Sequence, residues 1–260
     1  MWPRDRGVED VVRIGRLAVE LWTLVGESST LVASHVLGPD HSVTELAQAI
    51  RGLHGRVKHR AVTIAFESAW MPVVFVDAGD EILLPAQMEQ FIRHRLSLYG
   101  PDSFGLRSSW DVRSEHRVGS RQSMGYGLPL LVKAAVVDAT RAADIRMRLM
   151  TSAFSWAWAR QGKGARKGAS AWFALCEQDR TLIGRVHSGR ISDLNTGASP
   201  ASNGQEVKVL VEIEAMRTGA DAIHPITIVD WPNAASIQKA TAGAPPYPAN
   251  REVSAASGAA

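Results

Sequence analysis

A single cysteine, Cys176, occurs in the 260 residues of this chain. One thiol excludes an internal disulfide framework and any zinc site built from several cysteines. No apolar run approaches the roughly 20 residues that a membrane-spanning helix needs. The first residues carry charges of both signs and lack the apolar stretch of a signal peptide. We therefore expect a soluble protein of the cytoplasm.

Signatures of common enzyme chemistry are also absent. The eight histidines show no metal-binding spacing such as HExxH, no serine lies in a GxSxG motif, and the run AWFALC around Cys176 is typical of an inert core thiol. The 29 basic and 26 acidic residues leave a net charge of +3, which is too small a field to indicate nucleic acid. We expect no bound metal and no nucleic-acid partner.

The chain alternates short β-branched runs with amphipathic segments, and 45% of its residues are hydrophobic, as in ordinary globular proteins. Alternating runs predict three hairpins, each followed by a helix. This order favours a mixed α/β fold rich in antiparallel ribbons. The expected hairpin turns lie at 26–29, 68–70 and 179–180, the first of them after one long strand over 12–26.

Several segments place apolar side chains at helical spacing. Ser42, with Glu45 three residues later, has the spacing of a capping box and predicts the start of the first helix. Pro85 and Pro129 are suited to the starts of two others. The expected helices cover 43–55, 85–99, 130–145, 151–160 and 205–219.

Composition divides the chain at one basic, glycine-rich stretch, QGKGARKGAS, over residues 161–170. It does not match the phosphate-binding pattern GxxxxGK[ST], because Gly168 follows Lys167. Beyond residue 233 the composition is dominated by Ala, Ser, Gly and Pro, which favours disorder. The expected organisation is a flexible N-terminus (1–10), a first lobe (11–160), a basic hinge (161–169), a second lobe (170–232) and a disordered tail (233–260).

Four segments in this order carry a resemblance to a known fold: VVFVDAGDEILLPAQMEQFIRHRLSLYG, WDVRSEHR, LLVKAAVVDATRAADIRMRLMTSAFSWAWAR and AWFALCEQDRTLIGRVHSGR. The pattern is similar to the actin-like ATPase (ribonuclease H-like) fold. In particular it resembles the cytoplasmic part of GspL-type proteins of type II secretion and the PilM-type proteins of type IV pilus assembly. Over about residues 10–232 the resemblance implies two ribonuclease H-like lobes.

The same resemblance implies a function. It points to an assembly scaffold that binds an inner-membrane pilus or secretion component at the cytoplasmic face and need not hydrolyse ATP. The sequence contains neither the transmembrane and periplasmic parts of the secretion protein nor an asparagine-rich pocket that maps onto the pilus protein. The identity of the partner is therefore left open.

Active members of that fold carry Asp-x-Gly on their first hairpin, where a carboxylate reaches the metal and turn amides bind phosphate. The first expected turn here reads Gly26-Glu27-Ser28, and the turn at Asp179-Arg180 lacks the glycines of a second phosphate loop. Asp77-Ala78-Gly79 does have the triplet, but at an expected strand end, where Asp77 and Gly79 are either an ordinary turn or a weak nucleotide contact. We expect no cofactor and no enzymatic activity. The alternatives are a diverged ATP-binding enzyme and an unrelated α/β protein of unknown activity.

Aromatic and basic side chains are the candidates for partner binding. Phe154, Trp156 and Trp158 are spaced i, i+2 and i+4, so they cannot all share one helix face. Either both tryptophans pack in the core, or Trp158 lies at an interface, where tryptophan offers a large contact area. Trp70, in the expected turn, is the second exposed aromatic candidate. The hinge forms either a solvated linker or a contact with anionic lipid, worth about 1 kcal/mol per basic residue, through Arg160, Lys163, Arg166 and Lys167.

Overall fold

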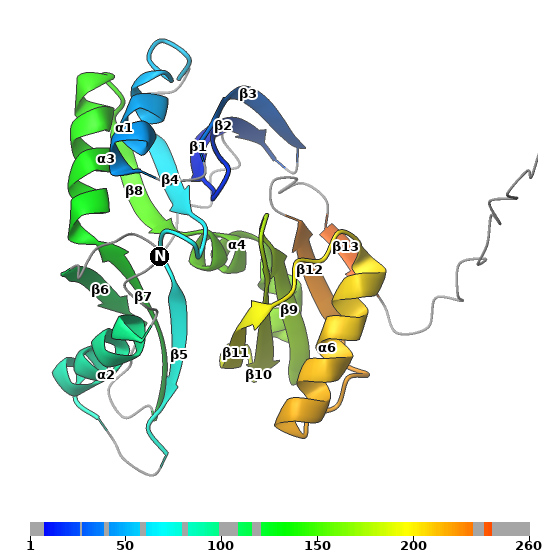
Figure 1. Cartoon of the computed structure of the whole chain (residues 1–260). Coiled ribbons are helices and arrows are strands. Elements are labelled where there is room, and N and C mark those ends of the chain that lie inside the picture. The colour runs from blue at the N-terminus through cyan, green and yellow to red at the C-terminus, as the bar shows by residue number, and fades with distance from the viewer. Residues whose placement is uncertain are drawn as a thin grey trace, which may run out of the picture.

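The computed structural model describes residues 8–26, 28–38, 42–57, 61–79, 83–98, 109–115, 121–230 and 237–240. Within these ranges the chain forms two five-stranded sheets, one three-stranded sheet and the helices that cover them (Figure 1). The predicted mixed α/β fold is confirmed.

The first sheet has the strand order β3-β2-β1-β4-β8. Strands β1, β2 and β3 form an antiparallel ribbon. Strand β4 pairs in parallel with β1, and β8 pairs in parallel with β4. Helices α1 (Val43–Arg51) and α3 (Leu130–Ala142) contribute to the apolar core on one face of this sheet. The strands are β1 (Val8–Ile14), β2 (Ala18–Val25), β3 (Ser28–Val36), β4 (Val62–Phe66) and β8 (Met147–Ser152).

The second sheet repeats this arrangement, with the order β11-β10-β9-β12-β13. An antiparallel ribbon is again followed by a helix, α6 (Gly204–Thr218), and by a strand that returns parallel to the first strand of the ribbon. The last strand is antiparallel to its neighbour. The strands are β9 (Ser170–Cys176), β10 (Thr181–His187), β11 (Arg190–Ala198), β12 (Ile226–Asp230) and β13 (Ile237–Ala240).

The three-stranded sheet, with the order β5-β7-β6, is inserted between β4 and α3. Helix α2 packs on one face of it through Met88, Ile92 and Leu96. The close approach depends on glycine, because a Cβ at Gly125 or Gly127 would lie 2.5 Å from Ile92 or Leu96. The elements are β5 (Val73–Asp77), α2 (Pro85–Ser97), β6 (Trp110–Ser114) and β7 (Gln122–Pro129).

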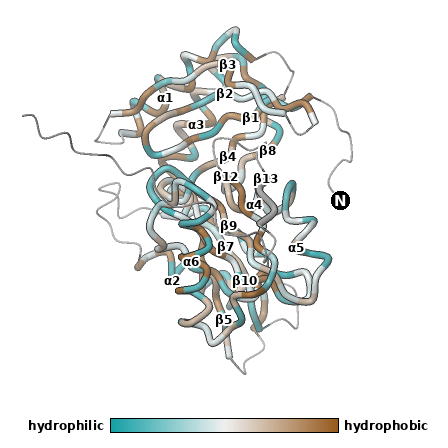
Figure 2. The backbone as a smooth tube through the Cα atoms, turned by 90° about the vertical axis from the view of Figure 1, so that its right-hand side faces the viewer, coloured by the Kyte–Doolittle hydropathy of each residue, from teal (hydrophilic) through white to brown (hydrophobic). Residues whose placement is uncertain are grey.

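Helix α4 (Ala153–Gln161) lies between the sheets, as Figures 1 and 2 both show. Its residues Phe154 and Trp156 belong to one buried cluster that draws side chains from all three sheets. Phe154 meets Phe173 of β9 edge to face, with ring centroids 5.5 Å apart. In the predicted hinge, residues Lys163–Lys167 form the short helix α5. The hinge and the lobe boundaries themselves stay predictions.

Two local predictions were wrong. Residues 12–26 are not one strand, because the chain turns back at Gly15 and β1 pairs with β2. The runs on either side of 68–70 do not form a hairpin, since β4 pairs with β1 and β8 whereas β5 pairs with β7. Residues 62–66 are all buried, as expected for a central parallel strand and not for a half-exposed ribbon. In the predicted disordered tail, 237–240 forms β13, and residues 241–260 lie outside the described ranges.

Candidate functional site

Three chain segments meet where the two five-stranded sheets face each other. They are the β1–β2 turn (15–17), the two residues after β4 (67–68) and the β9–β10 turn (177–180), and we call them together the junction. The first hairpin of the chain therefore turns at Gly15-Arg16-Leu17, and the predicted hairpin around 26–29 is the next one, formed by β2 and β3. The hydrogen bonds and ion pairs of the junction run directly between the two sheets' segments.

Arg13 is the charged centre of the junction, and only 1% of it is exposed. Its Nε donates to Glu67 Oε1 at 2.9 Å, and one terminal nitrogen donates to Glu20 Oε2 at 3.0 Å. A second guanidinium nitrogen also pairs with Glu67. Trp22 Nε1 donates to the same Glu20 oxygen at 2.8 Å. Since a buried guanidinium is tolerated only when it is paired and hydrogen-bonded, these carboxylates hold Arg13 at the end of β1.

The backbone amides of the β1–β2 turn are bound by side chains of the protein. The Arg16 amide donates to Glu67 Oε2 at 3.2 Å, and the Leu17 amide donates to Gln178 Oε1 at 3.1 Å. A Cβ on Gly15 would lie 3.1 Å from the same Glu67 oxygen and 3.2 Å from the same Gln178 oxygen. The turn is thus filled by two side chains, one of which comes from the second sheet.

Glu177 closes the junction from the other side. Its Oε1 accepts from the Ser68 backbone amide at 3.0 Å, and its Oε2 accepts from the Ser68 hydroxyl. Burial raises the pKa of Glu177 to about 8, and the nearby Glu67 carboxylate adds to the rise. Burial also raises the pKa of Glu67, against the opposing effect of Arg13. At neutral pH we therefore expect Glu177 to be protonated beside a Glu67 that is paired with Arg13.

Asp179 forms the outer part of the junction. Arg16 donates to Asp179 Oδ2 at 3.1 Å, and Arg180 donates to the same carboxylate at 2.9 and 3.1 Å. Burial opposes its ionisation, but the hydrogen bonds and charges of Arg180 and Arg16 outweigh that effect and lower the pKa of Asp179. This carboxylate is ionised at neutral pH and is committed to two guanidinium groups.

The junction does not fit a nucleotide and its metal. A phosphate site needs free backbone amides, and both turn amides already have acceptors within the protein. The buried charged group at the end of β1 is a guanidinium, which cannot be a metal ligand. Among the described residues no three His, Cys, Asp or Glu side chains are grouped so as to hold a metal ion. The side chains of the junction therefore serve to join the two sheets.

The arrangement of the sheets decides the fold. The structure is similar to a protein of unknown function with an actin-like ATPase fold from Bacteroides thetaiotaomicron, with a TM-score of 0.55, 10% identity, and 87% of this chain and 82% of that chain covered. The chain has the actin-like ATPase fold. No protein-family model and no curated protein sequence matches it.

Two other structures with this actin-like fold are also similar to the chain. One is the cytoplasmic domain of EpsL, an inner-membrane component of the type II secretion system of Vibrio cholerae, with a TM-score of 0.51, 11% identity, and 86% of this chain and 82% of that chain covered. The other comes from the PilM–PilN type IV pilus biogenesis complex, with a TM-score of 0.50, 18% identity and coverages of 85% and 68%. The predicted resemblance is confirmed at the level of the fold.

Asp77 and Gly79 are not part of the junction. Asp77 ends β5 in the inserted sheet, where its carboxylate accepts from the Gly79 amide at 2.8 Å and from Gln122 Nε2 at 2.7 Å. Gly79 has a φ of +62°, a left-handed conformation that glycine adopts without strain. These contacts form a turn, and a nucleotide contact at the two residues stays a prediction.

The two tryptophan candidates lie in different surroundings. The expected exposure of Trp70 is wrong: it is 1% exposed, and its Nε1 donates to the Gly15 carbonyl at 2.8 Å, so it supports the β1–β2 turn from within. Trp158 is half-buried and meets Phe173 edge to face, with ring centroids 5.1 Å apart. Partner binding through Trp158 stays a prediction.

The basic candidates divide into two pairs. Arg160 binds Glu9 at 3.0 Å and the Gly26 carbonyl at 2.9 Å, and Arg166 donates to the carbonyls of Trp158 and Ala159. The two remaining candidates, the lysines of α5, have no hydrogen bond or ion pair to other described residues. They are Lys163 and Lys167. A contact with anionic lipid stays a prediction. The ion pair with Glu9 neutralises the charge of Arg160, whereas carbonyl acceptors leave Arg166 charged, so three basic residues could still make such a contact.

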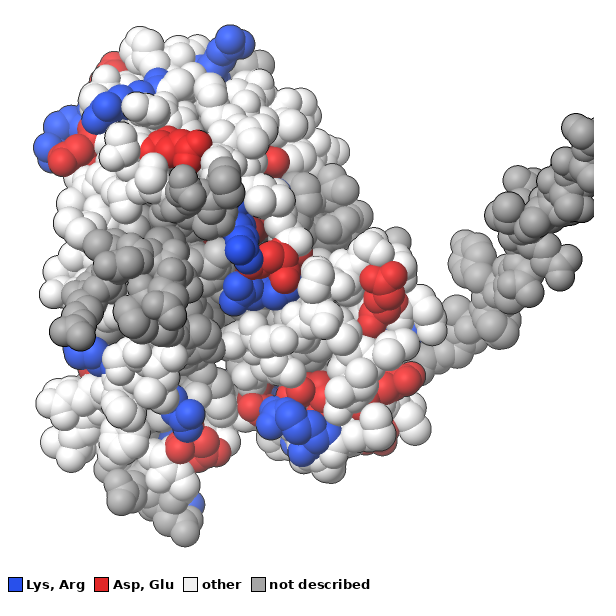
Figure 3. Space-filling model, viewed as in Figure 1, with Lys and Arg blue, Asp and Glu red and all other residues white. Residues whose placement is uncertain are grey.

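On the face shown in Figure 3, basic and acidic side chains are interspersed and are separated by wide uncharged areas. None of the helices in the described ranges combines the length and apolarity that crossing a bilayer requires.

Sequence reasoning missed the residues that form the junction. Arg13, Glu67 and Glu177 each stand within or directly after an apolar strand run: VVRIG, TIAFE and FALCE. A charged residue at such a position is rarely buried unless it has a partner. That pattern was the available signal, although it could not show which residues pair.

Proposed function

We propose that this chain is a non-catalytic actin-like scaffold that binds a protein component of a type IV pilus or type II secretion-like assembly at the cytoplasmic face of the inner membrane. The observation that carries the proposal is the filling of the β1–β2 turn by Glu67 and Gln178. A nucleotide would have to displace both side chains and expose the buried Arg13. Such a displacement costs more than a phosphate would regain from two amides.

The assembly named in this proposal is supported by the similar structures. EpsL is described as an inner-membrane component of type II secretion, and PilM was solved in a complex with PilN. Both are similar to this chain over more than four fifths of its length, at low sequence identity. By analogy with these two proteins, the proposed role of this chain is to bind a membrane component, and the proposal names no particular partner.

Affinity capture tests the proposal directly. The cytoplasmic tails of inner-membrane pilus and secretion components from the source organism are immobilised one at a time and exposed to the purified chain. We expect one tail to retain the chain, while an unrelated control protein of similar pI is not retained. If no tail retains the chain, or if the purified chain turns over ATP, the scaffold proposal is contradicted.

A further inference from the structure

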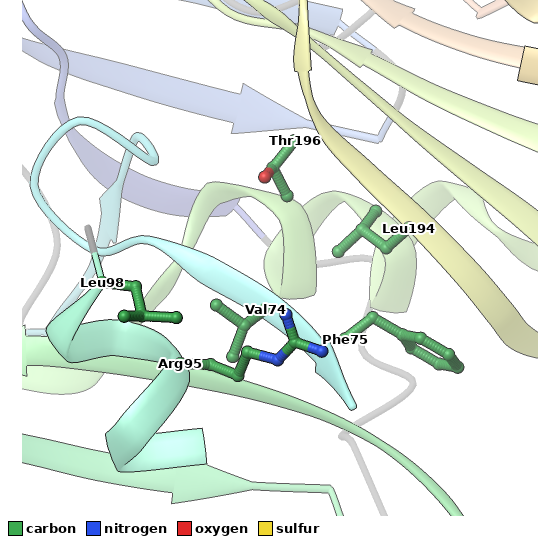
Figure 4. Close-up of a pocket in the computed structure, with 6 residues that line it drawn as sticks. All are labelled: Val74, Phe75, Arg95, Leu98, Leu194 and Thr196. Carbon is green, nitrogen blue, oxygen red and sulfur yellow. The ribbon is translucent and has the colours of Figure 1, made fainter. Parts of the chain in front are cut away.

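A small groove lies where β11 of the second sheet runs beside β5 of the inserted sheet, and Figure 4 shows the side chains that line it. Its volume of about 290 Å³ is just below the roughly 300–1,000 Å³ that is typical of small-molecule sites. The closeness of the two strands leaves no room there for a further strand. A contact with another molecule is better served by a second apolar surface, which lies on helix α6.

Helix α6 carries apolar side chains on two opposite faces, and it lies on the outer side of the second sheet (Figure 1). The inner face is buried against that sheet, through Val207, Val211 and Ala215. On the outer face Val209, Ile213 and Met216 are 45%, 53% and 76% exposed. The outer face of a surface helix is ordinarily polar, so these three exposed side chains are unusual.

The three exposed residues, which we call the α6 stripe, have the spacing of a coiled-coil seam. Ile213 stands four positions after Val209, and Met216 stands three positions after Ile213, so all three lie along one side of the helix. In a heptad they occupy positions d, a and d, which are the positions that pack between two helices. Since each is at least 45% exposed, no described residue covers the stripe.

Two charged side chains flank the α6 stripe, one on each side, at the g and e positions. Glu212 is exposed and has no hydrogen bond or ion pair to other described residues. Arg217 donates to Glu214 and Asp193 through Nε and one terminal nitrogen. Its other terminal nitrogen, Nη1, makes no hydrogen bond to a described residue, and the side chain is 55% exposed. The stripe is thus bordered by an acid and a base that can each take a further partner.

We propose that the α6 stripe joins two copies of this chain through a parallel pair of α6 helices related by a two-fold axis. In a parallel pair each g position lies beside the e position that comes five residues later in the other helix. Arg217 stands five positions after Glu212, so the two meet across the axis, and they do so twice. In an antiparallel pair g positions face g positions and e positions face e positions, so this complementary contact is lost.

The stripe is short, and the contact is correspondingly weak. Glu206, one turn before Val209, ends the seam because its carboxylate is held at the start of the helix by Ser202 and Asn203. About two helical turns offer fewer residues than the roughly 20–30 a side of a standard interface, so we expect a dissociation constant above the micromolar range. The chain's own residues 241–260 fit the stripe poorly, because Tyr247 and Val253 are their only aromatic or branched aliphatic side chains.

Sedimentation velocity of the whole chain, from micromolar to submillimolar concentration, tests the contact. We expect the mean mass to rise towards twice that of one chain. Ile213→Asp should raise the dissociation constant by at least about tenfold, because it places a charge at the centre of the seam. The control Leu131→Asp adds the same charge at a 55% exposed position of α3 and should leave the dissociation constant unchanged.

A second pair of variants tests the flanking charges. Glu212→Lys places a lysine beside Arg217 of the second copy, so it should weaken the dimer several-fold, and more at low salt than at high salt. Asp138→Lys makes the same change of charge at a 67% exposed position of α3 and should have no such effect. Equal dissociation constants for the two variants would contradict the contact between Glu212 and Arg217.

A thiol on the stripe tests the orientation of the pair. Val209→Cys sets two thiols across the two-fold axis of a parallel pair, within reach of a disulfide, whereas an antiparallel pair centred on Ile213 separates them by about 12 Å along the axis. Cys176 is buried and does not compete. Mild oxidation should therefore give a covalent dimer, and Lys208→Cys, beside the stripe, should give much less of it.

The outcomes separate this interface from the proposed scaffold function, on which it does not depend. A chain that stays monomeric at every concentration overturns the interface, and so does a dimer that Ile213→Asp leaves intact. A dimer that forms no disulfide through Val209→Cys overturns the parallel arrangement. If the chain is monomeric and Ile213→Asp abolishes retention by a tail in the capture experiment, the stripe binds that tail and the second copy is ruled out. A dimer without any retained tail supports the interface and contradicts the scaffold function.

Discussion

The backbone amide of Ser68 donates to the carboxyl group of Glu177 at 3.0 Å, across 109 positions of sequence. Ser68 closely follows a strand of the first sheet, and Glu177 directly follows a strand of the second. The contact is buried, and it joins the two five-stranded sheets through a carboxyl group whose pKa is raised by burial.

The first prediction concerns pH. The folded pKa of Glu177 is raised to about 8 from an ordinary value of 4.5, so the folded state holds a proton that the unfolded chain releases between these values. Stability is therefore greatest below the unfolded pKa and falls as pH rises towards about 8. The melting temperature should drop by several degrees from pH 5 to pH 8.5, and Glu177→Gln should flatten this dependence. A melting temperature that rises with pH in the original chain would contradict the assignment.

The second prediction concerns the buried ion pair. Arg13→Met leaves Glu67 buried without its main partner, which should lower the free energy of unfolding by about 3–5 kcal/mol. The control is Arg93→Met, which breaks a pair whose side chains are each 48% exposed and should cost about 1 kcal/mol or less. Urea denaturation of both variants measures the difference. Equal losses would mean that Arg13 is not the centre of the junction.

The third prediction concerns nucleotide binding. Because the amides of Arg16 and Leu17 are bound within the protein, titration calorimetry with ATP and Mg²⁺ should show no binding in the micromolar range. Asp77→Ala should leave that result unchanged, since its carboxylate binds Gly79 and Gln122. Micromolar binding that disappears in Asp77→Ala would favour the diverged ATP-binding enzyme instead.

The fourth prediction concerns the packing of α2. A methyl group at Gly125 would lie within 2.5–2.7 Å of three atoms of Ile92, so Gly125→Ala should destabilise the chain by about 1–3 kcal/mol. Gly164→Ala serves as the control, because its added Cβ would approach nothing closer than 3.9 Å. The double variant with Ile92→Ala should lose less stability than the sum of its single changes. Strict additivity would show that the two residues are not in contact.

Local signals in the sequence predicted individual elements well and their pairing less well. Ser42 caps α1 as expected from its spacing to Glu45, whose amide donates to the serine hydroxyl at 3.1 Å. The run over 62–66 was recognised as a strand, but its partners lie about 50 residues before it and 85 residues after it. Alternation of apolar and polar residues in a short run indicates which face of a strand is buried. It does not indicate which distant strand lies next to that strand in the sheet.

The junction was beyond prediction for a similar reason. Two of its ion pairs join residues that are 54 and 163 positions apart: the first needs β1 and β4 to have paired, and the second needs the two sheets to have come together. The turn at Gly15 was missed because apolar residues continue on both sides of it, and Trp70 was expected to be exposed because turns usually are. The fold class, in contrast, follows from the order of strands and helices, which the sequence shows directly.

Helix α4 has a consequence for how the molecule unfolds. One face of each of the three sheets is completed by the same apolar cluster around this helix. Detaching any one sheet would expose the helix to water and weaken the support of the other two, so no sheet can melt at small cost by itself. We expect a single cooperative transition in calorimetry, with the chain behaving as one thermodynamic unit despite its division into three sheets.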